Sequence, residues 1–271
     1  MPGRSRLLLQ RGQEGEGGAL MKPKLGVFSF TSCEGCQLTI LNLEDQMLDL
    51  LGAVEIVNFR EAIDDRRNDY DVAFVEGSIT TPEEVEEVQA IRGRAKILVA
   101  IGACATIGGI NALKNRHDLA TTKQKVYGDG ARHFPSEPTR RVRDVVPVDY
   151  EMHGCPIDKI ELVRVTKSLL LGQIPLPSEH ALCTECKQRV NVCLYDKGIC
   201  CIGPIVRSGC GAICPAFGEA CVACRGFLSH PNIASMVEIL KSKGLSRAEV
   251  EDRLTQFNSL TPVDLSPYYL S

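Results

Sequence analysis

Residues 25–36, LGVFSFTSCEGC, join a short apolar run to two cysteines and decide how the first part of the chain is interpreted. Leu25–Phe30 has the length of a buried strand, and Cys33 and Cys36 follow directly after it. Further apolar runs of strand length are Ala53–Phe59, Asp71–Glu76, Lys96–Ile101 and a weaker Val148–Met152. Strands that alternate with helical stretches predict a parallel sheet covered by helices.

Helical patterns separate these strands. Apolar residues recur at helical spacing after the first strand: Leu38, Leu41, Met47, Leu48 and Leu51. A second helix is expected to start at Thr81-Pro82-Glu83-Glu84, whose residues suit a helix N-terminus. The fold class predicted for this part is α/β, a flavodoxin-like doubly wound parallel sheet.

The composition changes near Ile174, where Pro175 and Pro177 mark a linker. We expect a flexible N-terminal extension over 1–21, a flavodoxin-like domain over 22–176 and a Cys-rich domain over 177–271. Two closing helices are expected, one with an apolar face over 233–240 and one over 250–257. Met21 is an alternative start, and 1–20 have neither the apolar region nor the cleavage site of an export signal.

Charge and cysteine content narrow the function. The net charge of −3 offers no basic stripe for nucleic acid, and no apolar run reaches the roughly 18 residues of a membrane span. Thirteen cysteines in a chain without an export signal argue against a disulfide framework and favour thiolate ligands for zinc or iron–sulfur clusters.

Four cysteines follow predicted strands. Cys33 and Cys36 follow the first strand, Cys104 the fourth and Cys155 the fifth. Functional sites in open α/β sheets lie beyond the carboxyl ends of the strands, so these loops are expected to converge. Four thiolates suit a cubane cluster, with nearby glycines that let the backbone approach its sulfides. Structural zinc is the alternative, but it usually takes its ligands from close pairs.

Three motifs carry a resemblance: TSCEGCQ at 31–37, GACATIGG at 102–109 and HGCPID at 153–158. On these motifs the chain after Met21 resembles the small subunits of nickel–iron hydrogenases, most closely the cytoplasmic, sulfhydrogenase and NAD(P)-linked type. The cluster subunit of respiratory complex I is similar but has two adjacent cysteines after the first strand, where this chain separates Cys33 from Cys36. By this resemblance, Cys33, Cys36, Cys104 and Cys155 bind the proximal [4Fe-4S] cluster.

Nine cysteines occupy residues 183–224. Divided in chain order, and supported by the resemblance, they give two further [4Fe-4S] sites, a distal one and a medial one. The distal ligands are Cys183, Cys186, Cys193 and Cys201, and the medial ligands are Cys210, Cys214, Cys221 and Cys224. Cys200 is then a spare thiol beside Cys201. A shifted set that starts at His180 and an exchange of ligands between the two sites remain alternatives.

The resemblance implies the rest of the function. Hydrogen is split at a nickel–iron centre in a separate large subunit, and three clusters carry the electrons toward a flavin and NAD(P) subunit and further iron–sulfur subunits. No catalytic residue is expected in this chain, although Glu76 could support proton movement or the subunit interface; a solvated strand-end carboxylate is the alternative. Other acceptors considered are a heterodisulfide reductase, a deazaflavin carrier and a quinone. The location expected is the cytoplasm.

Overall fold

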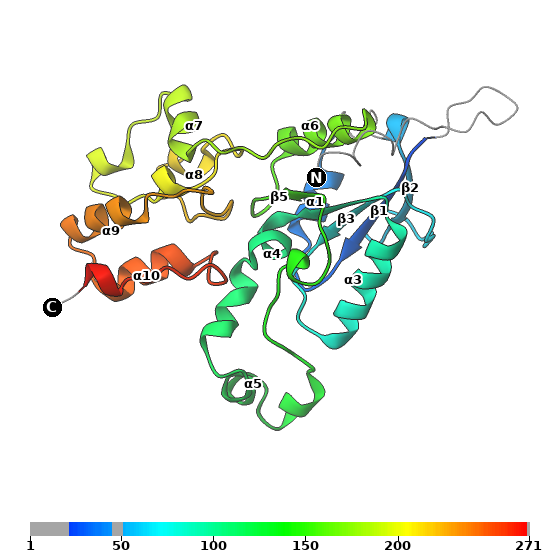
Figure 1. Ribbon diagram of the computed structural model, residues 1–271, viewed down its shortest axis with the longest axis horizontal. Helices are drawn as coiled ribbons and strands as arrows, with labels where there is room; N and C mark the ends of the chain where they lie inside the picture. Colours follow the sequence, from blue (N-terminus) through cyan, green and yellow to red (C-terminus); the bar gives the residue numbers. More distant parts are fainter. Residues whose placement is uncertain (1–21, 45–50, 270–271) are drawn as a thin grey trace, which may run out of the picture.

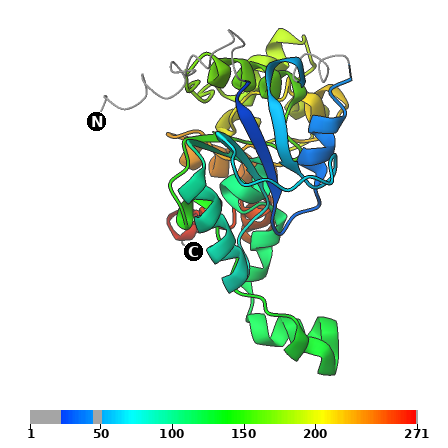
Figure 2. The ribbon, with the colours of Figure 1, turned by 90° about the vertical axis from the view of Figure 1, so that its right-hand side faces the viewer.

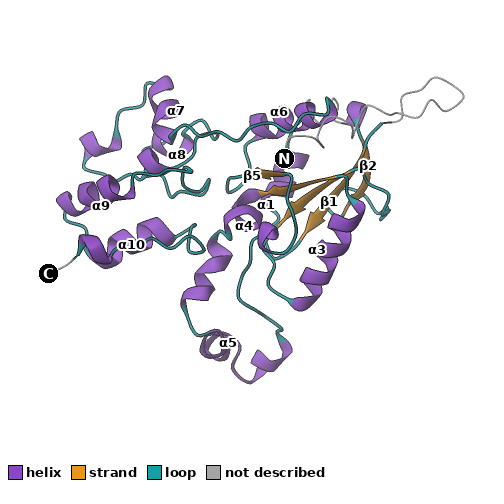
Figure 3. Ribbon diagram, in the orientation of Figure 1, coloured by secondary structure: helices purple, strands orange, loops and turns teal. Residues whose placement is uncertain are grey.

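The computed structural model describes residues 22–44 and 51–269. We call 22–44 and 51–176 the sheet half, and 177–269 the Cys-rich half. The predicted extension over 1–21 and the helical residues Met47 and Leu48 lie outside the described residues. Figures 1 and 3 show the sheet with helices packed on it, and beside it a region of short helices and loops.

The sheet half contains five parallel strands in the order β2-β1-β3-β4-β5, which is the flavodoxin-like order. The strands are β1 (Lys24–Ser29), β2 (Glu55–Phe59), β3 (Val72–Glu76), β4 (Ile97–Ile101) and β5 (Tyr150–Met152). The predicted α/β parallel sheet is therefore confirmed. Two strands were predicted to begin two residues early: the second begins at Glu55, since Ala53 is helical, and the fifth begins at Tyr150 instead of Val148.

Side chains alternate between the two faces of the central strands because successive residues of a strand point to opposite sides. Val72 and Phe74 of β3 join the core beneath α1 (Gly35–Leu41) and α6 (Lys159–Leu170). Ala73 and Val75 join the core beneath α3 (Pro82–Arg94). Every residue of β3 and β4 is buried, so helices cover both faces of the sheet.

Helix α3 begins where the sequence predicts. The Thr81 side chain accepts a hydrogen bond from the backbone N–H of Glu84, and the Glu84 carboxylate accepts from the backbone N–H of Thr81. Pro82 occupies the first turn, where no backbone donor is needed. This reciprocal cap fixes the start of the helix.

A lobe of three short helices extends from the sheet half between β4 and β5 (Figure 2). After α4 (Gly102–Ile107), it comprises η1 (Ile110–Arg116), α5 (Leu119–Tyr127) and η2 (Gly128–His133), and η3 (Val142–Asp144) leads back to β5. The rings of Tyr127 and Phe134 stack with centroids 4.1 Å apart.

The Cys-rich half consists of short elements around a separate core. They are α7 (Leu182–Gln188), η4 (Leu194–Lys197), η5 (Gly203–Ile205), α8 (Ile213–Ala216), α9 (Ile233–Ser242), α10 (Arg247–Thr255) and η6 (Ser266–Tyr268). The two closing helices are thus confirmed as α9 and α10. Their buried faces pack on a core that includes cysteine side chains as well as aliphatic ones.

None of the helices within the described ranges has the length and apolar character needed to span a bilayer.

Candidate metal centres

The first group of thiols lies at the carboxyl ends of the parallel strands, as predicted. Cys33 follows β1, Cys36 lies in the first turn of α1, Cys104 lies in α4 directly after β4, and Cys155 follows β5. Cys36 is buried, whereas Cys33 and Cys155 are exposed. Because parallel strands end at one edge, residues far apart in sequence meet there.

The thiols of this group act on one another. Burial, reinforced by the neighbouring Cys155 and Cys33, raises the pKa of Cys104 to about 12. Burial also raises the pKa of Cys36, with the Glu76 carboxylate as the next cause. Four thiolates at this edge are therefore unfavourable unless positive charge compensates them, which is what bound metal ions provide.

Glycines allow the close approach of these loops. Gly102 has φ 86°, and a Cβ at this position would lie 2.5 Å from Cys36 Sγ. Gly154 has φ 137°, and its carbonyl accepts a hydrogen bond from the backbone N–H of Ala103 at 2.6 Å. A Cβ at Gly154 would lie 2.6 Å from the carbonyl oxygen of Pro156, so a side chain at Gly102 would collide with Cys36 and one at Gly154 would collide with its own loop.

Glu76 is not the solvated strand-end carboxylate considered as an alternative. It is only 2% exposed at the end of β3. Its Oε1 accepts a hydrogen bond from the backbone N–H of Cys36 at 3.0 Å, and its Oε2 accepts from the backbone N–H of Gln37 at 3.3 Å. The carboxylate thus satisfies two otherwise free donors at the start of α1 and fixes the loop that holds Cys36.

A second group lines a cavity of about 90 Å³ in the Cys-rich half: Cys183, Cys186, Cys193 and Cys201. Burial raises the pKa of Cys183 to about 11, and the other three thiols of the group reinforce the shift. Asn191 Nδ2 lies 3.6 Å from Cys186 Sγ, and the Tyr195 hydroxyl donates to the carbonyl of Cys201 at 2.5 Å.

Cys200 and His180 differ from this group. Neither is among the described residues that line the cavity. Cys200 is buried in the core that α9 and α10 cover, and its carbonyl accepts a hydrogen bond from Arg253 Nη1 at 2.9 Å. His180 is exposed. The geometry therefore groups Cys201, rather than Cys200, with the other three thiols.

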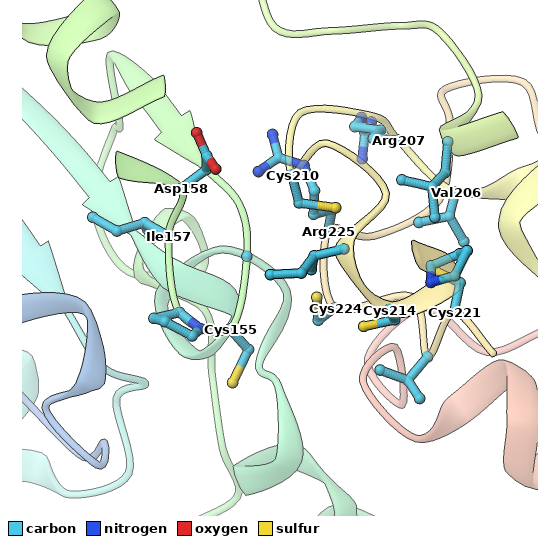
Figure 4. A pocket seen from close by; sticks show the side chains of 16 residues that line it. Cys155, Ile157, Asp158, Val206, Arg207, Cys210, Cys214, Cys221, Cys224 and Arg225 are labelled. Atoms are coloured by element: carbon cyan, nitrogen blue, oxygen red, sulfur yellow. The ribbon is translucent and has the colours of Figure 1, made fainter. Parts of the chain in front are cut away.

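The third group lines a larger cavity of about 180 Å³, which Figure 4 shows: Cys210, Cys214, Cys221 and Cys224. Cys155 of the first group lies on the opposite side of this cavity, on the loop after β5. Burial raises the pKa of Cys224 to about 11 despite a hydrogen bond from the backbone of Cys155. The backbone N–H of Cys221 lies 3.4 Å from Cys201 Sγ. The third group thus shares a cavity with Cys155 of the first group and contacts Cys201 of the second.

Within residues 22–44 and 51–269, no three His, Cys, Asp or Glu side chains stand close enough to bind one metal ion together. The thiols of the Cys-rich half instead surround the two cavities. One thiolate for each of several irons is the arrangement of a cysteine-ligated cluster, so the donor chemistry fits iron–sulfur clusters.

The sequence analysis missed one charged pair beside these groups. Arg225 and Glu161 are 3% and 4% exposed, and Arg225 Nη1 lies 2.8 Å from Glu161 Oε2. Their separation of 64 positions leaves no local pattern to detect. The only signal was the position of Arg225 directly after Cys224.

Comparison with known proteins identifies the class. A family model described as NADH ubiquinone oxidoreductase, 20 Kd subunit, matches residues 33–169. The delta subunit of Sulfhydrogenase 2 from Pyrococcus furiosus is 38% identical over 80% of this chain and 92% of its own length. A subunit of the F420-non-reducing hydrogenase from Methanocaldococcus jannaschii is 29% identical over 89% of this chain and 95% of its own length.

A solved structure agrees with these relatives. The crystal structure of an NAD+-reducing [NiFe]-hydrogenase in the H2-reduced state contains a chain with 28% identity and a TM-score of 0.52. The match covers 57% of this chain and 94% of that one. The chain belongs to the family of the 20 Kd subunit of NADH ubiquinone oxidoreductase and, within it, to the small subunits of nickel–iron hydrogenases.

Proposed function

We propose that this small subunit carries electrons through three [4Fe-4S] clusters, each held by one of the three thiol groups. The proximal site takes the group at the sheet edge, the medial site the group around Cys210 to Cys224, and the distal site the group that contains Cys201. The observation that carries the proposal is that twelve of the thirteen cysteines fall into three groups of four.

The contacts between groups support the order proximal, medial, distal. Cys155 lines the same cavity as the medial group, and the backbone N–H of Cys221 contacts Cys201 Sγ of the distal group. Exposed cysteines occur in the two outer groups, namely Cys33, Cys155 and Cys193. The proximal and distal groups therefore contain the solvent-exposed cysteines. Partner subunits bound at these two groups would cover them.

When bound, such all-thiolate clusters supply one-electron carriers of low potential. The residues of this chain hold and surround them. Glu76 fixes the turn that presents Cys36, and the glycines at 102 and 154 let the ligand loops meet. Burial of the thiols lowers the local dielectric and limits water access, both of which influence a cluster's potential.

The partner at the sheet edge is the nickel-containing large subunit, where hydrogen is split. At the distal end, we propose a flavin subunit that uses NAD(P), with further iron–sulfur subunits and a cytoplasmic location. Support comes from the 28% identity to a chain of an NAD+-reducing [NiFe]-hydrogenase. The second candidate is transfer to a heterodisulfide reductase or a deazaflavin carrier; the Methanocaldococcus jannaschii relative, which aligns over 89% of this chain, is named for not reducing the deazaflavin F420 and so argues against the deazaflavin carrier.

Metal analysis tests the proposal. The complex purified without oxygen is expected to contain about twelve irons and twelve labile sulfides in this chain, from four per cluster. Cys201→Ser is expected to lose the iron of one cluster, whereas Cys200→Ser, one position away, keeps all of it. Stoichiometric zinc, or iron loss in the Cys200 variant alone, would contradict the assignment.

A further inference from the structure

Arg225 connects the Cys-rich half to the sheet half through a guanidinium that is almost fully buried. It directly follows Cys224, and its side chain makes four polar contacts. Nη2 donates to Glu161 Oε1 at 3.0 Å, and Nη1 lies 2.8 Å from the other carboxylate oxygen. Nη1 also donates to the carbonyl of His153 at 2.6 Å, and Nε donates to the carbonyl of Ser208 at 2.7 Å.

Both carbonyls belong to segments that carry cluster ligands. His153 precedes Cys155 of the proximal group by two residues. Ser208 precedes Cys210 of the medial group by two residues. Since Arg225 is itself next to a medial cysteine, one guanidinium joins three ligand-bearing segments from two sites.

The surroundings fit the flat, forked shape of arginine. Gly209 has φ 120°, and a Cβ at this position would collide with the guanidinium of Arg225. A carboxylate that accepts from the same fork gives the pair a fixed geometry, which the single ammonium of lysine cannot reproduce. Glu161 lies in the first turn of α6, so its position depends on the sheet half.

Burial of such a pair is a weak source of stability, because removing both charges from water costs about as much as their attraction returns. What a well-satisfied buried network does provide is one definite arrangement of the parts it joins. The contacts of Arg225 fall where the proximal and medial groups approach each other.

We propose that Arg225, with Glu161, is a positioning residue that fixes the separation between the proximal and medial clusters. The inference rests on the proposed function, since it requires clusters at both thiol groups. Electron transfer between clusters slows steeply as their separation grows, so a fixed separation sustains the rate. In this proposal Arg225 acts through the ligand segments that its guanidinium joins.

The test uses the complete complex and the magnetic interaction between the two reduced clusters, measured as splitting of their electron paramagnetic resonance signals. Arg225→Met combined with Glu161→Met removes both charges and leaves neither unpaired. This double variant is expected to keep its full iron content but to show a weakened, broadened splitting. Arg225→Lys keeps the positive charge but replaces the planar guanidinium with a single ammonium group. It is expected to weaken the splitting less than the double variant does.

Arg207→Met is the matched control. Arg207 lines the same cavity and also carries a positive charge, but its ion pair with Glu179 is longer, at 3.6 Å, and more exposed. This variant is expected to shift the medial potential at most and to leave the splitting unchanged. Unaltered splitting in the lysine and double-methionine variants, with full iron, would overturn the inference. Iron well below twelve in the unaltered protein would instead contradict the proposed function.

Discussion

The central strands of the sheet half carry aliphatic side chains on both faces, whereas the Cys-rich half places cysteines within its core. β3 and β4 alternate between two aliphatic cores. The core of the Cys-rich half includes Cys200, Cys201 and Cys221 beside its aliphatic residues, and α8 is only four residues long. Hydrophobic burial explains the first fold, and we expect the second to depend as well on what the thiols bind.

Removal of iron is the largest perturbation that separates the two halves. In the full chain stripped of iron, we expect residues 183–224 to lose protection from amide hydrogen exchange. The pKa values of Cys183 and Cys224, both raised to about 11 by burial first of all, leave these thiols protonated and without metal bonds at neutral pH. Strands β3 and β4 are expected to keep their protection because their cores contain no cluster ligand except Cys36.

The exchange experiment has an internal reference. Protection in β3 and β4 measures global unfolding, and protection in α7 measures the Cys-rich half alone. If both regions lost protection together, the halves would form one cooperative unit joined through contacts such as those of Arg225. If neither region lost protection, the aliphatic side chains of the Cys-rich core would be sufficient to keep that half folded without iron.

A substitution in the core of the sheet half tests whether hydrophobic burial stabilises that half. Phe74 is 1% exposed in β3. Phe74→Ala is expected to lower the free energy of unfolding by about 3–5 kcal/mol, the usual range for truncation of a buried aromatic residue. The iron of the medial and distal sites is expected to remain at temperatures where the chain is folded, since Phe74 lies away from both thiol cavities of the Cys-rich half. Denaturant unfolding and iron analysis on the same sample measure both quantities.

The two halves also differ in how much could be predicted from the sequence. Strand positions followed from apolar runs, because a parallel strand buried on both faces leaves a continuous apolar signal. The start of β2 was placed two residues early because Ala53 and Val54 are apolar but belong to the end of a helix and its connection. Motif spacing gave the three cysteine groups, and the two cavities of the Cys-rich half match two of them.

Side-chain partners across the chain could not be predicted. Glu76 was noticed for its position at a strand end, but its hydrogen bonds to the start of α1 depend on the pairing of β1 with β3. Arg225 and Glu161 meet only because the Cys-rich half packs on α6. The sequence analysis assigned Cys201 rather than Cys200 to the distal group, and Cys201 does line that cavity, but spacing alone does not specify the directions of two adjacent side chains.

The smallest expected effect concerns two carboxylates that cap helices, one in each half. A hydrogen bond with Thr121 lowers the pKa of Asp118 at the start of α5, and one with Ser246 lowers the pKa of Glu249 at the start of α10. A carboxyl with a lowered pKa in the folded state stabilises the fold above its unfolded pKa, and that contribution is lost as the pH falls through the folded pKa.

In the iron-free chain, Asp118 is therefore expected to keep its lowered pKa, because α5 belongs to the sheet half. Glu249 is expected to return toward its ordinary value, because α10 packs on the core that the thiols help to form. Carboxyl-carbon nuclear magnetic resonance during an acid titration measures both groups in one sample, and Ser246→Ala serves as the reference for Glu249 without its cap. A lowered pKa for Glu249 in the iron-free chain would mean that α9 and α10 stay folded without clusters. The dependence on metal would then be confined to the cysteine loops, and the sheet half and the closing helices would have to be treated as one metal-independent scaffold.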